Sequence, residues 1–244
     1  MVFILILINL NLEIKNLIKS YHLNPQKISI VLYSINEKRF IYTYNEKKPL
    51  IPASNLKLLI SGYLLENWNK NFLNYLRRYT SRVYYKKRIL FELNSKSNNQ
   101  LANLLFYLIG KYKKTSSEKI IKSFLKEKKI PIENLKIVDG SGYSKKNRLT
   151  SLTLINLLIY FYFSPYQKEF LKSLAVSGKK GTLKKRLLNY PKQIFAKTGY
   201  LKNVYSLSGY YFKNDKKYIF SIIINDKITP KNYWQFLNEF FTFL

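Results

Sequence analysis

The chain has 244 residues, 47% of them apolar and 16% aromatic, so it can bury a full core, and we expect one compact domain. It contains no cysteine, which excludes disulfides, a thiolate nucleophile and a cysteine-ligated metal site. The single histidine, His22, lies in a polar stretch that predicts a solvated loop, which argues against a Ser-His-Asp triad.

The net charge of +30, from 43 basic and 13 acidic residues, would ordinarily indicate an anionic partner. The excess is mostly lysine, spread along the whole chain and accompanied by abundant Asn, Ile, Tyr and Phe, as in an AT-biased genome. A protein that reads nucleic acid more often clusters its charge and uses arginine for bidentate contacts. We therefore expect no nucleic-acid partner, and keep a basic nucleic-acid-binding protein as an alternative.

The apolar segment Val2–Leu12 is too short to span a bilayer and has no basic residue ahead of it, so we expect no stable transmembrane span. One interpretation is a signal-peptide remnant over residues 1–11, followed by a single domain over residues 12–244. The other is an amphipathic first helix, because an apolar face continues as far as Ile18. The sequence favours neither.

Further along, Ile28–Tyr33 and Arg39–Tyr44 are rich in β-branched and aromatic residues and predict a hairpin. Ser54 then opens an apolar stretch, Leu56–Trp68, of helical length with a leucine-rich stripe. The basic, tyrosine-rich connector from Asn69 to about Lys87 allows no assignment.

Three helices are predicted in the middle of the chain. Gln100–Ile109 is the first, and we expect Gly110 to end it as a C-cap. Glu118–Lys128 is the second, and the strongly apolar Thr150–Phe163, which must be buried, is the third. A tight turn at Asp139–Gly142 precedes the third helix.

The spacing of apolar residues changes from a helical to a strand pattern in the last third of the chain. The predicted strands there are Ile194–Thr198, Tyr205–Phe212 and Tyr218–Ile224. The turn Lys213–Lys216 joins the last two strands, and Tyr233–Leu244 closes the chain as an apolar helix. Strands at both ends of the chain with helices between them predict one antiparallel sheet, completed by N- and C-terminal strands and covered by helices.

The first chemical signal is Ser54-Asn55-Leu56-Lys57 at the head of a predicted helix. Residues three apart share one face, so the Lys57 amine can reach the Ser54 hydroxyl. A lysine can take the serine proton only if its own pKa falls from about 10.4 to about 7. Desolvation, the helix end and a neighbouring cation, for which Lys197 is the candidate, would all lower it. Taken alone, the S-x-x-K motif is weak evidence, because a serine and a lysine at this spacing arise by chance in a lysine-rich chain.

Two further motifs follow. In Ser97–Asn99, Ser97 could relay a proton and the Asn99 amide could hold a substrate carbonyl, although such a segment is also an ordinary N-cap. In Lys197–Gly199 an ammonium and a hydroxyl on a strand would bind a carboxylate, and the glycine would let a substrate backbone approach. Strand lysines are more often simply solvated.

The order of the three motifs, S-x-x-K, S-x-N and K-T-G, is that of penicillin-binding proteins and β-lactamases. The chain resembles the D-alanyl-D-alanine carboxypeptidase/endopeptidase family, the class C low-molecular-mass penicillin-binding proteins, from about Ile28 to Ile224. The blocks that carry the resemblance are Pro52–Leu58, Lys96–Ala102, Val138–Gly142, Gly181–Leu183 with Arg186, and Ala196–Gly199 followed by Ser206–Tyr210.

This resemblance implies an α/β, β-lactamase/transpeptidase-like fold, with helices on both faces of the sheet. It implies a periplasmic serine-type carboxypeptidase or endopeptidase that acts on peptidoglycan peptides, is inhibited covalently by β-lactam antibiotics, and needs no cofactor or metal. Asp139–Gly142 and Arg186 would be structural. The implied site comprises Ser54 as the acylated nucleophile, Lys57 as its base, Ser97 in proton transfer, Asn99 orienting the substrate, Lys197, Thr198 and Gly199 binding it, and the backbone N–H groups of Ser54 and Tyr200 as the oxyanion hole.

The chain departs from the family pattern at two points. Family members usually carry large inserted domains between the first two motifs, whereas only about forty residues separate Lys57 from Ser97, so we expect a bare catalytic domain. Asn98 stands where Asp is frequent. An inactive relative that binds cell-wall peptide, and a β-lactamase, are the alternatives within this resemblance.

Overall fold

A computed structural model describes residues 2–79 and 85–244, with side chains from residue 9 onward. In these residues, strands from both ends of the chain form one six-stranded sheet in the order β2-β1-β6-β5-β4-β3, and every neighbouring pair is antiparallel. The predicted antiparallel sheet is therefore confirmed. The strands are β1 (Ile28–Ser34), β2 (Arg39–Tyr44), β3 (Ala175–Val176), β4 (Ile194–Leu201), β5 (Val204–Lys213) and β6 (Lys216–Ile224).

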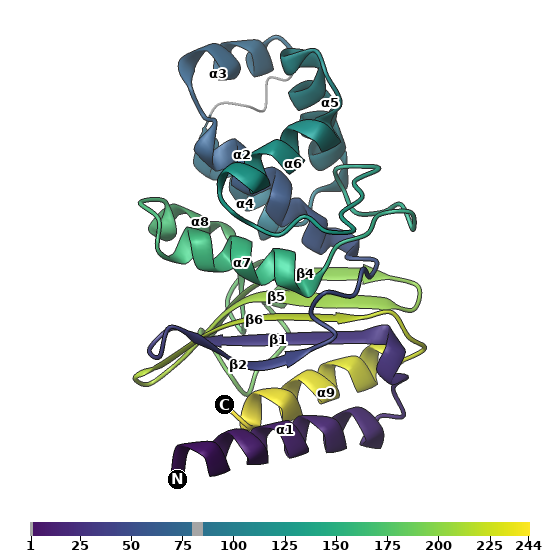
Figure 1. Ribbon diagram of the computed structural model, residues 1–244. Coiled ribbons are helices and arrows are strands. Elements are labelled where there is room, and N and C mark those ends of the chain that lie inside the picture. Colours follow the sequence, from purple (N-terminus) through teal and green to yellow (C-terminus); the bar gives the residue numbers. More distant parts are fainter. Residues whose placement is uncertain (1, 80–84) are drawn as a thin grey trace.

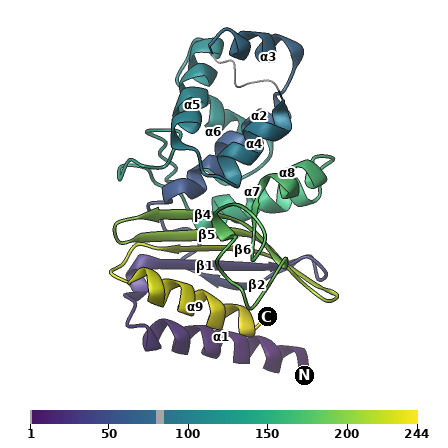
Figure 2. The ribbon, with the colours of Figure 1, turned by 180° about the vertical axis from the view of Figure 1, so that it is seen from behind.

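Helices cover both faces of this sheet, as the resemblance implied. In Figure 1 the helices α2 to α8 lie above the sheet, and α1 and α9 lie below it; Figure 2 shows the same layers from behind. The helices are α1 (Val2–Ser20), α2 (Lys57–Glu66), α3 (Lys70–Arg77), α4 (Lys86–Asn94), α5 (Asn99–Lys113), α6 (Ser117–Glu127), α7 (Ser151–Tyr162), α8 (Gln167–Ser173) and α9 (Pro230–Thr242), with short 3-10 turns η1 (Pro25–Lys27), η2 (Ala53–Leu56) and η3 (Gly181–Leu183).

Strand β6 lies between two hydrophobic cores, which explains its unbroken apolar run. Side chains alternate between the faces of a strand. Ile219 and Ile223 belong to the core under α2 to α8, whereas Phe220, Ile222 and Ile224 belong to the core against α1 and α9. A strand buried on both faces is apolar at nearly every position.

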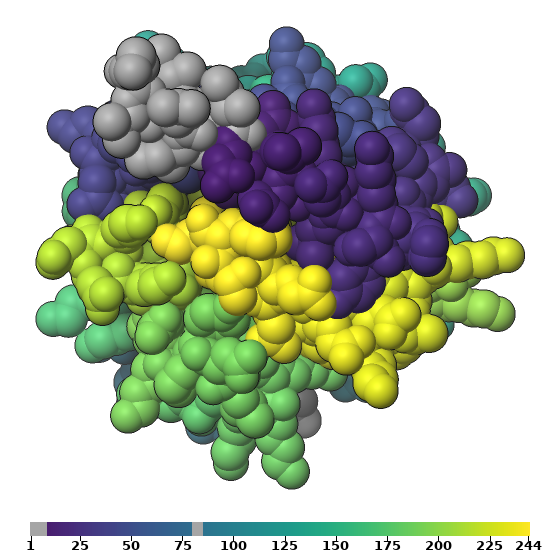
Figure 3. Space-filling model, turned by 90° about the horizontal axis from the view of Figure 1, so that it is seen from below, coloured from purple at the N-terminus to yellow at the C-terminus, as the bar shows by residue number. Residues whose placement is uncertain are grey.

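Helices α1 and α9 lie side by side over the lower face of the sheet, as Figure 3 shows in purple and yellow. Ile14 and Ile18 of α1 are buried there, and Tyr21 packs edge-on against Phe236 of α9. The buried face belongs to the amphipathic helix that was one of the two sequence interpretations, and the helix runs unbroken past residue 11. Among the described helices, none is long and apolar enough to cross a membrane.

Two local predictions need correction. Gly110 does not end a helix: α5 continues to Lys113, and Lys114 is the left-handed cap residue. A side chain at Gly110 would meet the Ser117 hydroxyl at 2.6 Å, so close packing explains the glycine. The helix predicted to reach Trp68 ends at Glu66.

The unassigned connector contains helical structure. Asn69 caps α3, and α4 begins at Lys86 in the last part of the connector. Residues 80–84 of the connector lie outside the described residues. The predicted loop position of His22 is confirmed, since that residue is exposed in a turn.

Candidate active site

Ser54 and Lys57 lie one tight turn apart where the sheet meets the helical layer. The segment is the 3-10 turn η2, which passes directly into α2 at Lys57. Side chains three residues apart eclipse one another in a 3-10 turn. Lys57 Nζ accordingly lies 2.8 Å from Ser54 Oγ. The first motif therefore brings amine and hydroxyl together, more directly than the α-helix predicted for it.

Contacts with the strands hold this turn in place. Ser206 Oγ donates to the carbonyl oxygen of Pro52 at 2.7 Å, and Asn55 Nδ2 donates to Ser208 Oγ at 3.0 Å. Ala53, between them, has φ +46°, a left-handed conformation that costs a non-glycine residue about 1–2 kcal/mol. The strain and the buried bonds indicate that this fold fixes the position of Ser54.

Lys57 is fully buried, and its amine has three acceptors. Besides Ser54 Oγ, these are Asn99 Oδ1 at 2.7 Å and the carbonyl oxygen of Ser141 at 2.6 Å. Burial lowers the pKa of Lys57 to about 7, and the carboxylate of Asp139 opposes this by favouring the charged form. At neutral pH a large share of Lys57 is therefore uncharged, with a lone pair beside the hydroxyl.

The second motif meets both buried lysines. Asn99, at the start of α5, accepts from Lys57, and Ser97 Oγ accepts from Lys197 Nζ at 2.8 Å. The cap residue of α5 is Asn98, whose side chain accepts from Leu101 N. Asn98 thus has the capping role, which leaves its two neighbours to face the site. Ser97 is left-handed at φ +60°, a second strained position at this site.

Lys197 of β4 is also fully buried. Its amine donates to Ser97 Oγ and, at 2.8 Å, to the carbonyl oxygen of Thr198. Burial, and then the charge of Lys57, place the pKa of Lys197 well below its ordinary value. Of the causes expected to lower the pKa of Lys57, burial is the one that acts here, and the charge of Lys57 in turn lowers the pKa of Lys197.

The proposed oxyanion donors lie at a close approach between η2 and β4. A side chain on Gly199 would come within 3.0 Å of the backbone nitrogen of Ser54 and 2.2 Å of Ser206 Oγ. Only a glycine permits this contact. Tyr200 follows directly on β4 with its side chain 61% exposed, at the open edge of the site.

The loop Asp139–Gly142, interpreted from sequence as structural, accepts a hydrogen bond from the Lys57 amine through the carbonyl oxygen of Ser141. Asp139 holds the loop, because its carboxylate accepts from the backbone N–H groups of Gly142 and Ser144, each at 2.6 Å. Asn103 of α5 accepts from Ser141 N at 2.8 Å. The sequence signals for this loop were an acidic residue followed by small residues in a tight turn and its place among the blocks of the family resemblance.

Among the described residues no group of three His, Cys, Asp or Glu side chains could hold a metal ion.

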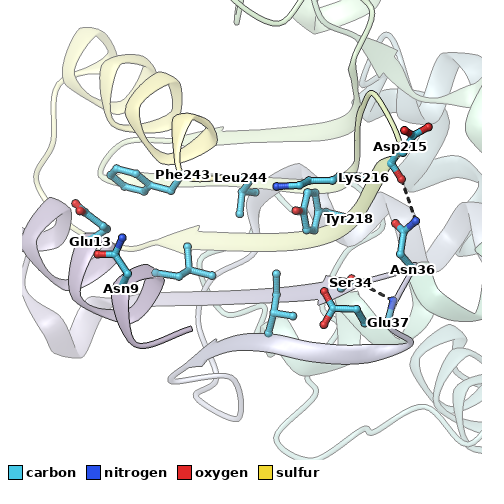
Figure 4. A pocket seen from close by; sticks show the side chains of 12 residues that line it. Asn9, Glu13, Ser34, Asn36, Glu37, Asp215, Lys216, Tyr218, Phe243 and Leu244 are labelled. Atoms are coloured by element: carbon cyan, nitrogen blue, oxygen red, sulfur yellow. Dashed lines mark hydrogen bonds between the residues drawn. The ribbon is translucent and has the colours of Figure 1, made fainter. Parts of the chain in front are cut away.

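A cavity of about 560 Å³ lies apart from this site, between α1, the end of α9 and the β1–β2 and β5–β6 turns. Figure 4 shows Glu13, Glu37 and Asp215 around it. None of the motif residues lines that cavity.

The sequence model of the D-Ala-D-Ala carboxypeptidase 3 (S13) family matches residues 86–242. This match includes the second and third motifs and begins after Ser54 and Lys57. D-alanyl-D-alanine carboxypeptidase DacB of Haemophilus influenzae is 32% identical over 132 residues, which are 50% of this chain and 28% of that protein. Penicillin-sensitive carboxypeptidase A of Dictyostelium discoideum is 30% identical over 146 residues, 53% of this chain and 28% of the relative. The matched part is thus little more than a quarter of each relative.

Solved structures share the fold. Penicillin binding protein 4 from Haemophilus influenzae, complexed with a β-lactam, superposes with a TM-score of 0.77 at 15% identity, over 94% of this chain and 98% of that chain. Another structure of that protein is 27% identical with a TM-score of 0.57, over 64% of this chain and 38% of that chain. An ancestral class A β-lactamase gives 0.72 at 14% identity, over 96% and 98% of the two chains. The β-lactamase/transpeptidase-like fold is confirmed.

Proposed function

Because this chain belongs to the D-Ala-D-Ala carboxypeptidase 3 (S13) family, we propose that it is a serine-type D-Ala-D-Ala carboxypeptidase that cleaves peptidoglycan peptides through an acyl-enzyme on Ser54. The observation that carries the proposal is the 2.8 Å contact of a buried, pKa-lowered Lys57 amine with the Ser54 hydroxyl. The alternatives of a nucleic-acid-binding protein and of an inactive relative gain no support from the family match or the fold.

Acylation begins when neutral Lys57 takes the proton of Ser54 and Oγ attacks the carbonyl carbon of the penultimate D-alanine. The carbonyl oxygen becomes an oxyanion, which accepts from the backbone N–H groups of Ser54 and Tyr200. Gly199 leaves room for the substrate backbone at this point. Asn99, already held by Lys57, orients the substrate amide.

The proton that Lys57 took from Ser54 passes to the leaving amine through Ser97, which is bonded to Lys197, and Lys57 becomes neutral again. The C–N bond breaks, D-alanine leaves, and the acyl group remains as an ester on Ser54. Water then attacks the ester, with Lys57 again as base, and releases the shortened peptide. No step calls for a cofactor.

The terminal carboxylate of the substrate binds between Lys197 and Thr198. In the free site burial disfavours the charged form of Lys197, and its pKa is low for that reason. An arriving carboxylate favours the ammonium, so substrate and proton bind together. This charge requirement selects peptides with a free C-terminus. A β-lactam, whose carboxylate and strained amide present the same groups, would acylate Ser54 covalently.

Because the proposed substrate is the cell wall, the proposed location is the periplasm.

Intact mass after incubation with benzylpenicillin tests the nucleophile. The wild type should gain one penicillin mass, Ser54→Ala should gain none, and Ser123→Ala, at an exposed serine of α6, should behave as the wild type. An adduct that persists in Ser54→Ala would place the nucleophile elsewhere. A wild type that neither gains the adduct nor hydrolyses a D-Ala-D-Ala peptide would contradict the proposal.

A further inference from the structure

A second cavity, of about 250 Å³, adjoins the site along β4. Its lining includes Thr198 and Gly199, two residues of the third motif, and the cavity extends towards the first turn of α9. We call it the Arg186 pocket, defined by Arg186, Thr198, Tyr200, Tyr205, Tyr233 and Trp234. If the terminal carboxylate binds at Thr198, the amino acid after the scissile bond lies at the mouth of this pocket.

Arg186 supplies a positive charge at the pocket. Its guanidinium lies over the Trp234 ring, 4.6 Å from the centroid, so the aromatic contact holds it in place. Within residues 2–79 and 85–244, no carboxylate forms an ion pair with Arg186. A guanidinium presents a planar fork of donors that matches a carboxylate. The pocket therefore offers a preoriented cation without an internal anion.

Tyr233 gives independent evidence for a ligand. Its side chain is only 2% exposed and lines the pocket, yet its hydroxyl has no hydrogen-bond partner among the described residues. A buried tyrosine hydroxyl usually finds a partner, because leaving it unpaired costs about 1–3 kcal/mol. An acceptor from outside the chain, bound in the pocket, would supply the missing bond.

We propose that the Arg186 pocket is a leaving-group subsite, which binds the side chain of the amino acid after the scissile bond and prefers one that carries a carboxylate. Arg186 and Tyr233 donate to that carboxylate, and the faces of Tyr200, Tyr205 and Trp234 contact the aliphatic part of the side chain. This assignment rests on the proposed function. It extends the substrate class from peptides that release D-alanine to peptides that release a larger, acidic D-amino acid.

Charge and size both favour this ligand. The chain carries a net charge of +30, so an anionic side chain is attracted, whereas a cationic one would face Arg186 unpaired. A volume of about 250 Å³ admits one amino-acid side chain and is too small for a folded partner.

Binding can be measured without catalysis, because Trp234 lines the pocket and the only other tryptophan is Trp68. The background is Ser54→Ala with Trp68→Phe, and the ligands are N-acetyl-D-Ala-D-Glu and its neutral match N-acetyl-D-Ala-D-Gln. The acidic dipeptide should change the fluorescence saturably and bind about tenfold or more tighter than the neutral one. Arg186→Gln should abolish this preference, and Tyr233→Phe should reduce it. Equal binding of the two dipeptides, or a preference unchanged in Arg186→Gln, would overturn the assignment.

Turnover by the otherwise unmodified chain separates this inference from the proposed function. The ratio of kcat/KM for peptides ending in D-Ala-D-Glu and D-Ala-D-Gln should exceed one, and should fall to about one in Arg186→Gln. Penicillin labelling without any such preference would contradict the subsite but support the proposed carboxypeptidase function. A fluorescence preference for the acidic dipeptide without labelling or hydrolysis would support the subsite but contradict the proposed function.

Discussion

Ser141 and Lys57, 84 positions apart in the sequence, are joined by a 2.6 Å hydrogen bond from the lysine amine to the serine carbonyl oxygen. The loop that presents this carbonyl is itself held by the carboxylate of Asp139. The proposed base, Lys57, is therefore positioned by a segment outside the three motifs. The charge of Asp139 also opposes the effect of burial on the pKa of Lys57.

The rate of acylation should depend on pH through Lys57. Its amine can take a proton only when neutral, and burial lowers its pKa to about 7. At saturating penicillin, where the bound carboxylate already holds Lys197 charged, the first-order rate constant for acylation should thus rise about tenfold per pH unit below pH 7 and level off by about pH 8. Asp139→Asn, which removes the opposing charge, should move the midpoint to lower pH. A midpoint near 10 in the wild type would mean that Lys57 is not the base.

Replacing Lys57, the proposed base, should abolish penicillin labelling and make the protein more stable. At pH 6 the Lys57 ammonium is charged in both the folded and the unfolded chain, but it is buried only in the folded one. This burial lowers the free energy of unfolding by about 1.4 kcal/mol for each unit by which the pKa is lowered. Lys57→Met removes this cost but loses hydrogen bonds worth about 1 kcal/mol each. We expect no penicillin adduct and a free energy of unfolding in urea raised by roughly 1–2 kcal/mol.

Lys119→Met, at an exposed position of α6, is the matched control, and its unfolding free energy should stay within about 0.5 kcal/mol of the wild type. The predicted gain should also shrink by about 1.4 kcal/mol for each pH unit above 7, because folding must then strip a proton from the lysine and this becomes easier as the pH rises towards the ordinary lysine pKa. A loss of stability in Lys57→Met at pH 6 would show that the hydrogen bonds outweigh the buried charge.

Gly142 should be essential for the geometry of the site. It has φ +81°, and a side chain there would lie 1.9 Å from the carbonyl oxygen of Ala53, beside the nucleophile. Gly142→Ala should lower the free energy of unfolding by about 3 kcal/mol and strongly slow penicillin labelling. Gly178→Ala has a similar backbone conformation, φ +62°, but no atom closer than 3.5 Å, so it should cost only about 1 kcal/mol and label normally. Equal effects of the two changes would rule out the steric explanation.

Much of the sheet could be predicted because its strands are short-range patterns. The runs Tyr205–Phe212 and Tyr218–Ile224 are apolar enough to require burial on both faces, and a turn separates them. Helix α4 was not predicted, because it begins inside a lysine-rich connector whose surface charges hide the helical period. The prediction of a C-cap at Gly110 was wrong because close packing, here against Ser117, favours glycine just as a C-cap does.

The three motifs could be found because each is a short run of residues, and the structure brings their side chains together. The Ser141 carbonyl and the Arg186 pocket could not be found in this way. The carbonyl belongs to the backbone and carries no residue-type signal. The pocket is assembled from a loop, two strands and a helix that only the tertiary fold brings together.

Lys57 and Asn99 belong to the helical layer, and Lys197 belongs to the sheet. Ser54 lies where the helical layer meets the sheet. A chain whose helical layer had come away from its sheet would keep every one of these residues and lose the reaction. The fraction of the protein that is labelled covalently by a β-lactam would consequently equal the fraction that is natively folded. In a denaturant series, the labelled fraction after a brief pulse would give the unfolding curve of the whole protein, read from one serine.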